Sequence, residues 1–175
     1  MNPAALDAIL IRLCNNRDEA ALQELSHRYG QTAFGFLCGI YGHEAEKKRM
    51  LLIDAFIQTL QICASGKSSQ GFLIILMKTL YEKIGRDNPK DQTMPSSENK
   101  NLRSRWALEV LGRIPWRNRF LLLLRYQMDF LFEEMSFVFS DTAINIRKDF
   151  EKSVKMFEIA LAENMKARYD QLPRH

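Results

Sequence analysis

Apolar residues recur at spacings of three and four residues along almost the whole of this 175-residue chain. This period places them on one side of an α-helix, whereas a half-buried strand would show strict alternation of apolar and polar residues. No convincing alternation of the strand type occurs. With 46% hydrophobic residues, the chain also has enough apolar side chains to form a folded core. We therefore expect an all-α fold.

Breaks in the helical pattern predict where the helices begin and end. Asn2 before Pro3 is typical of a helix start, and the pair Asn15-Asn16 interrupts the first pattern. A second helix is expected to end in a turn at residues 39–42, which begins and ends with glycine. The remaining predicted helices span residues 44–64, 70–86, 102–112, 116–127, 131–139 and 142–166.

A stretch with little to bury divides the chain into two predicted helical domains. The boundary begins at Asp87, and residues 88–101 combine proline, serine and scattered charges, which is typical of a flexible linker. We therefore predict a helical bundle at residues 1–87 and a second helical domain at residues 102–175. Short loops in the first half favour antiparallel neighbouring helices.

Residues 132–148 predict a DNA-reading unit in the second domain. They combine a short helix, a tight polar turn at Ser140-Asp141 and a longer helix with a basic outer face, which is the pattern of a helix-turn-helix. Helical spacing predicts that the longer helix buries one stripe, which consists of Ala143, Ile146, Phe150, Val154 and Phe157. The residues expected to contact DNA are Thr142, Asn145, Arg147, Lys148, Lys152 and Lys155.

The residue types on this outer face suit both base and phosphate contacts. Asparagine can pair with an adenine edge and arginine with guanine, and each bidentate pair is worth about 1–3 kcal/mol of discrimination. Lysines contact phosphates, which position a helix without reading the sequence. Spacing alone leaves open that these residues form the solvated face of an ordinary amphipathic helix.

Charge, cysteines and missing motifs narrow the classes of function. The net charge of +4 permits a polyanionic partner. Cys14, Cys38 and Cys63 are widely spaced within apolar helical pattern, which predicts reduced core cysteines in a cytoplasmic protein and no metal site. The chain has no glycine-rich phosphate loop and no nucleophile motif, so we expect neither an enzyme nor a cofactor. The apolar runs are too short to span a bilayer.

Four short motifs follow one another in the second half of the chain. Ile114-Pro115 precedes the Leu-Leu-Leu-Leu-Arg-Tyr run at residues 121–126, and Glu-Glu-Met-Ser at residues 133–136 precedes Asn-Ile-Arg-Lys at residues 145–148. They resemble the Leu-Pro, Leu-Leu-Arg-Tyr, Glu-Glu-Ile-Ala and Thr-Val-Lys-Ser motifs of one family. That family is the small RNA polymerase sigma factors of the extracytoplasmic-function type.

This resemblance implies a domain plan and a set of partners. Residues 1–87 would form a sigma region 2-like bundle that docks on polymerase and melts the promoter. Residues 102–175 would form a sigma region 4-like helix-turn-helix domain with a C-terminal extension that reads the upstream promoter element. The implied partners are core RNA polymerase and promoter DNA, with an anti-sigma protein as a further candidate. No membrane and no small-molecule substrate are expected.

The resemblance also implies site residues in the first domain. Asp-Ala-Phe at residues 54–56 is similar to the Glu-Val-Phe end of the family's clamp-gripping helix. Asp54 and Gln58 are therefore the expected polymerase-binding residues, and spacing also turns Lys48 away from the apolar stripe. Tyr81 is the candidate for stacking on unpaired bases. The downstream promoter element is expected to contact three cations along one side of their helix, which are Lys78, Lys83 and Arg86.

Departures from the family pattern keep two other functions open. Acidic residues before the clamp motif are replaced by Lys48-Arg49-Met50, and the Asn and Asp of the melting helix by Thr79 and Lys83. Reversing charge at a docking surface turns attraction into repulsion. One alternative is a divergent sigma-like interaction module without initiation activity. The other is an independent helix-turn-helix regulator whose first domain dimerises or senses a signal.

Overall fold

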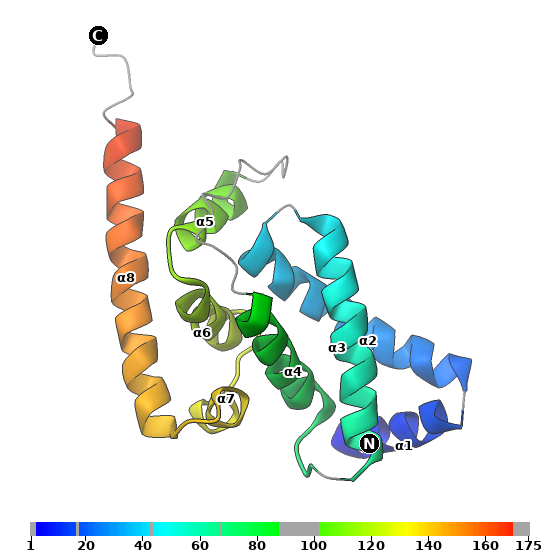
Figure 1. The fold of residues 1–175 in the computed structure, drawn as a ribbon. Helices are drawn as coiled ribbons and strands as arrows, with labels where there is room; N and C mark the ends of the chain where they lie inside the picture. The colour runs from blue at the N-terminus through cyan, green and yellow to red at the C-terminus, as the bar shows by residue number, and fades with distance from the viewer. Residues whose placement is uncertain (1–2, 17, 43, 67, 88–101, 170–175) are drawn as a thin grey trace.

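A computed structural model describes residues 3–16, 18–42, 44–66, 68–87 and 102–169, and this part of the chain is all-helical, without any strand. Figure 1 shows α8 as a long helix along one side of the molecule, with its last turns extending beyond the other helices. The described helices are α1 (Pro3–Asn15), α2 (Glu19–Tyr41), α3 (Ala45–Ala64), α4 (Phe72–Asp87), α5 (Leu102–Gly112), α6 (Trp116–Tyr126), α7 (Phe132–Phe139) and α8 (Ala143–Tyr169). The all-α prediction is confirmed.

The core of the first half lies between α2, α3 and α4. Phe36 of α2, Ala55 of α3 and Leu76 of α4 are fully buried, each on the apolar side of its helix. α1 packs beside α2 and α3, and its Leu10 reaches the same core. Helical spacing in the sequence places Ile9, Leu13 and Leu22 on the apolar stripes of α1 and α2, but the structure leaves these three residues exposed.

Two glycines at the end of α2 have different physical roles. Gly42 ends the helix with a positive φ of 59°, a conformation that glycine adopts without steric cost. Gly39 stays helical and is buried, and a Cβ atom there would lie 2.6 Å from Leu123 Cδ1. The predicted turn at residues 39–42 is therefore confined to its end, because Gly39 instead allows α6 to approach α2 closely.

The two predicted domains share one continuous core. The rings of Phe36 and Phe120 meet with centroids 4.7 Å apart, which joins α2 to α6. Tyr81 of α4 contacts Phe139 of α7 at 4.5 Å and Phe120 at 5.3 Å. Arg119 of α6 is fully buried and donates a 2.9 Å hydrogen bond from Nη1 to the backbone oxygen of Ile40. The two halves are therefore packed against each other through aromatic and polar contacts.

Asp87 belongs to α4 and not to the predicted boundary. Its Oδ2 accepts a 2.8 Å hydrogen bond from the Tyr41 hydroxyl and lies 2.7 Å from the Lys47 ammonium. Burial and the hydrogen bond to Asp87 raise the pKa of Tyr41 above its ordinary value. The predicted linker, residues 88–101, lies outside the described residues, so the division into two domains stays a prediction.

Candidate nucleic-acid interface

The connection between α7 and α8 has the tight geometry of a helix-turn-helix. Ser140 leaves α7 in the left-handed conformation, with φ 53°. The amide of Asp141 donates to the carbonyl of Ser136 at 3.0 Å, which satisfies one of the free carbonyls at the end of α7. At the start of α7, the amide of Leu131 donates to Glu134 Oε2 at 2.7 Å. Both ends of the short helix are therefore held by local hydrogen bonds.

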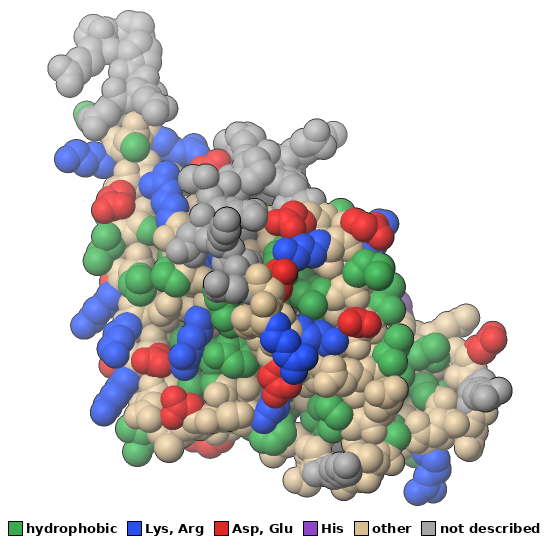
Figure 2. Space-filling model, viewed as in Figure 1, with side chains coloured by type: hydrophobic (Ala, Val, Ile, Leu, Met, Phe, Trp, Pro, Cys, Tyr) green, Lys and Arg blue, Asp and Glu red, His purple; other side chains and the backbone are tan. Residues whose placement is uncertain are grey.

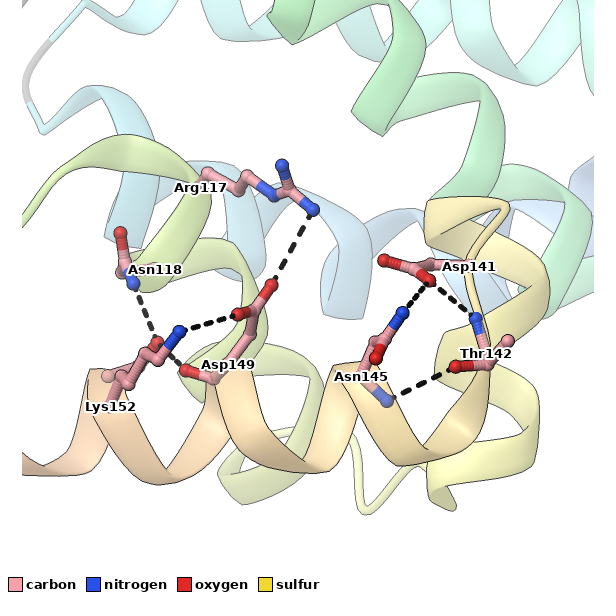
Figure 3. A network of polar contacts seen from close by, with 8 residues as sticks. Arg117, Asn118, Asp141, Thr142, Asn145, Asp149 and Lys152 are labelled. Atoms are coloured by element: carbon pink, nitrogen blue, oxygen red, sulfur yellow. Dashed lines mark hydrogen bonds and ion pairs between the residues drawn. The ribbon is translucent and has the colours of Figure 1, made fainter.

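The first turn of α8 is capped by the residues that the sequence singles out (Figure 3). Thr142 Oγ1 accepts from the amide of Asn145 at 3.2 Å, which is the bond of a helix N-cap. Asp141 Oδ1 accepts from the Thr142 amide at 2.7 Å and from Asn145 Nδ2 at 2.9 Å. These hydrogen bonds, first that from Asn145 and then that from Thr142, lower the pKa of Asp141. The carboxylate thus stays charged at the positive end of the helix dipole.

α8 packs along α6 and α7 through a narrower stripe than the spacing predicts. Ile146 is fully buried, whereas Phe150, Val154 and Phe157 are only half-buried. The last two line a groove of about 450 Å³ between α5, α6 and α8. The side chains that α8 buries instead include three that the stripe prediction left out, which are Ser153, Ala160 and Asn164. Ser153 is buried because Asn118 Nδ2 of α6 donates to its Oγ at 2.8 Å.

Five predicted DNA contacts are exposed along α8, with Asn145 and Arg147 on its two flanks, and we call this set the α8 outer face: Asn145, Arg147, Lys148, Lys152 and Lys155. Figure 2 shows basic side chains spaced along the outer edge of this helix. Lys148 and Lys155 form no ion pair with any other residue that the structure describes. Thr142, the sixth predicted contact, is exposed and caps the helix.

Two cations of the α8 outer face have partners within the protein. The Arg147 guanidinium lies 5.0 Å from the centre of the Phe132 ring, a cation–π contact with α7. The Lys152 ammonium lies 3.7 Å from Asp149. These contacts are at the surface, where an ion pair contributes about 0–1 kcal/mol and is easily exchanged. They orient the side chains without removing them from solvent.

Arg117 is a neighbouring cation that the sequence reasoning missed. Its Nη2 lies 3.7 Å from Asp149 Oδ2, so the first turn of α6 brings a third charge beside Lys152 (Figure 3). Its guanidinium also lies 5.9 Å from the ring of Phe139. The spacing of residues within one helix cannot predict the contact between Arg117 and Asp149, because this contact depends on how α6 crosses α8.

The three predicted downstream contacts are not brought together by the fold. Lys78 turns toward α7, where its Nζ donates to Ser140 Oγ at 3.0 Å and lies 4.6 Å from the ring of Phe137. Lys83 turns toward α3 and pairs with Asp54 at 3.1 Å. Arg86 is exposed. The expectation of one continuous basic side was wrong, because α4 packs between α3 and α7.

The candidate for base stacking is part of the core packing. Tyr81 contacts the rings of Trp116, Phe120 and Phe139. Burial is the main cause that raises the pKa of its hydroxyl. Helical spacing places Tyr81 outside the apolar stripe of α4, but the structure packs its ring against α6 and α7, where it joins the three helices.

The two predicted polymerase contacts on α3 differ in exposure. Asp54 is exposed but pairs with Lys83, a residue predicted for a different partner, and Gln58 is half-buried. The prediction that Lys48 points away from the core was wrong, because only 4% of this residue is exposed.

α3 also presents apolar side chains to solvent. Met50, Ile53 and Ile57 follow one another at helical spacing and are exposed by 62%, 56% and 52%. We call these three residues the α3 stripe. Sequence spacing did not single them out, because the inward stripe of the helix is also apolar.

Comparison with protein-family models and with curated protein sequences found no match to this chain. No group of His, Cys, Asp and Glu suited to holding a metal ion occurs among the described residues. None of the helices in the described ranges combines the length and the apolar character that crossing a membrane requires.

Proposed function

We propose that this chain is a sigma-factor-like transcription initiation protein that binds core RNA polymerase and directs it to promoter DNA. The observation that carries the proposal is the capped turn between α7 and α8, followed by the α8 outer face. A helix-turn-helix uses the first turns of its second helix to contact base edges. Here these turns hold Asn145, Arg147 and Lys148 at the surface.

In this proposal the α8 outer face divides its contacts between bases and phosphates. Asn145 and Arg147 lie nearest the turn and have the side chains that read adenine and guanine. Lys148, Lys152 and Lys155 lie along the exposed side, where they contact phosphates. Arg117 adds a phosphate contact from α6, because its guanidinium shares Asp149 with Lys152.

The α3 stripe is the proposed contact with polymerase. Exposed apolar side chains grouped on one helix are typical of a docking surface. Asp54 and Arg49 lie beside the stripe on the same helix and provide the polar rim that such surfaces have. Gln58 follows Ile57 and completes the proposed contact.

Contact with the downstream element requires a rearrangement. Lys78 is held by Ser140 and Phe137 of the second half, so in the proposed function it reaches DNA only after α4 and α7 separate. Lys83 likewise exchanges Asp54 for DNA. Arg86 needs no such change, since it is already exposed.

A second candidate is a sigma-like interaction module without initiation activity. It is favoured because Lys78 and Lys83, two of the three cations expected at the downstream element, contact other residues of the protein. Such a protein binds polymerase or DNA but does not start transcripts.

One experiment tests the proposal and separates the two candidates. The purified full chain is mixed with core RNA polymerase, and complex formation and run-off transcription on genomic fragments are both measured. Promoter-specific transcripts support the initiation function. A complex without transcripts favours the interaction module, and DNA binding that does not depend on polymerase favours an independent regulator.

A pair of matched variants tests whether the α3 stripe binds polymerase. Ile53→Arg puts a charge into the α3 stripe and is expected to abolish binding to core polymerase while DNA binding by α8 persists. Ile9→Arg makes the same change at an exposed isoleucine of α1 and is the control. Equal loss in both variants, or in neither, would contradict the assignment of the α3 stripe.

A further inference from the structure

Lys48 is a buried lysine beside a thiol. Only 4% of the residue is exposed, although it lies on α3 among charged neighbours. Its Nζ lies 3.3 Å from Cys38 Sγ of α2. The same ammonium donates to the backbone oxygen of Gly42 and lies 5.3 Å from the centre of the Phe34 ring. Phe34 and Gly42, at the end of α2, therefore hold the amine against the sulfur.

Cys38 differs from the other two cysteines in its chemical surroundings. All three are half-buried free thiols. Burial raises the pKa of Cys63 to about 11 and is also the main cause that raises the pKa of Cys14. Cys38 is distinguished by its geometry, because the Lys48 amine lies 3.3 Å from its sulfur. A nitrogen nucleophile therefore already lies beside Cys38 when this sulfur is oxidised.

We propose that Cys38 and Lys48 form a redox-sensitive modification site, at which peroxide joins Sγ to Nζ in a covalent sulfur–nitrogen bond. The position of the amine decides this outcome. A sulfenic acid condenses with the nucleophile nearest to it, either a thiol or a nitrogen. At Cys38 the nucleophile in hydrogen-bond range is the amine of Lys48.

The reaction has two steps, and peroxide is the oxidant in the first. The Cys38 thiol gives up its proton and its sulfur attacks one peroxide oxygen. The O–O bond breaks, the sulfur becomes a sulfenic acid, and the departing hydroxide takes up the proton and leaves as water. Lys48 then loses a proton to solvent and its amine attacks Sγ. The S–O bond breaks, the oxygen leaves as a second water, and a sulfenamide remains. One peroxide is reduced to two waters, and the protein loses two hydrogens.

The bond would form where the two halves of the molecule meet. Ile40, two residues after Cys38, accepts the hydrogen bond from the buried Arg119 of α6. Gly39 lies against Leu123 of the same helix. A link between Cys38 and Lys48 would fasten α3 to the turn of α2 on which α6 rests. Oxidation is therefore expected to stiffen this joint.

The test is mass spectrometry of the full-length chain treated with hydrogen peroxide. The link is expected to lower the intact mass by about 2 Da and to yield one peptide joining Cys38 to Lys48, both reversed by dithiothreitol. Cys14→Ser/Cys63→Ser serves as the background, so that no disulfide can form within the chain. A product in which Cys38 gains oxygen while Lys48 stays free would overturn the proposal.

Two substitutions at Lys48 separate the chemistry from the packing. Lys48→Met removes the amine and Lys48→Arg keeps a buried cation that does not condense. In both, peroxide is expected to leave Cys38 as a sulfenic acid that dimedone traps, whereas the parent chain gives little adduct. If Lys48→Met does not fold, Lys48→Arg decides alone. Equal dimedone labelling in the parent and in Lys48→Arg would also overturn the proposal.

Discussion

α8 and α4 both carry cations expected to contact DNA, yet the fold treats the two helices differently. The lysines and Arg147 of the α8 outer face stay at the surface. On α4, Lys78 is held by Ser140 and Phe137 of α7, and Lys83 by Asp54 of α3. The cations of the α8 outer face therefore stay exposed, whereas Lys78 and Lys83 are half-buried in contacts with neighbouring helices.

The difference follows from how the neighbouring helices are arranged around α4 and around α8. α4 lies between α3 and α7 and buries apolar side chains on more than one side, among them Ile75, Met77 and Leu80. α8 lies at the edge of the molecule, as Figure 1 shows, and one long side of it faces solvent. A helix that is apolar around much of its circumference is expected to be covered, and its cations then meet protein before they meet a partner.

The largest expected effect tests the packing that covers α4. Phe120 is fully buried and contacts the rings of Phe36, Tyr81 and Phe139. Phe120→Ala should lower the free energy of unfolding by about 3–5 kcal/mol, measured by chemical denaturation. Tyr126→Ala on the same helix is the control, because Tyr126 is 71% exposed. Similar small losses in both variants would mean that the two halves do not depend on a shared core.

The next effect tests base reading by α8. Arg147→Ala should reduce the preference for a specific site over random DNA by about 1–3 kcal/mol, because one bidentate base contact is lost. The measurement is a competition binding assay at fixed salt. Lys166→Ala makes a similar charge change near the far end of α8 and should leave the preference unchanged. An unchanged preference in Arg147→Ala would show that this side chain does not read bases.

A smaller effect compares the two helices directly. Each lysine that contacts a phosphate contributes about 0.9 to the slope of log affinity against log salt concentration. Lys148→Ala and Lys155→Ala should each reduce that slope by about 1, whereas Lys78→Ala should not change it as long as α4 and α7 stay packed together. A reduced slope in Lys78→Ala would indicate that α4 and α7 separate when DNA binds.

The smallest effect concerns the turn that presents α8. In the folded protein the pKa of Asp141 is lowered from 3.8. Its carboxylate therefore stabilises the fold above pH 3.8. This stabilisation is lost as the pH falls through the pKa that Asp141 has in the folded protein. The free energy of unfolding of the wild type should approach that of Asp141→Asn below pH 3.8. Glu133→Gln, at an exposed carboxylate of α7, is the control. If the free energies of unfolding of the wild type and Asp141→Asn differ by the same amount at every pH, the hydrogen bonds from Asn145 and Thr142 to the carboxylate are not the cause of the difference.

Local features of the candidate site were predictable, and contacts between distant segments were not. The turn at Ser140-Asp141 and the exposure of Lys148 follow from polar residues between two apolar patterns. By contrast, helical spacing predicted that Lys48 points outward, whereas the structure buries it against Cys38 and Phe34. A long lysine side chain can fold its methylenes over apolar surface, and helical periodicity has no information on that choice.

The sequence by itself determined the all-helical class, the approximate helix ends and the polar turn before α8, because these depend on interactions within a few residues. Only the tertiary structure decided which cations remain available to a partner. Lys83 meets Asp54 across 29 positions, and Lys78 meets Ser140 across 62. Such contacts depend on how helices cross, and the crossing is decided by packing of the shared aromatic core around Tyr81 and Phe120.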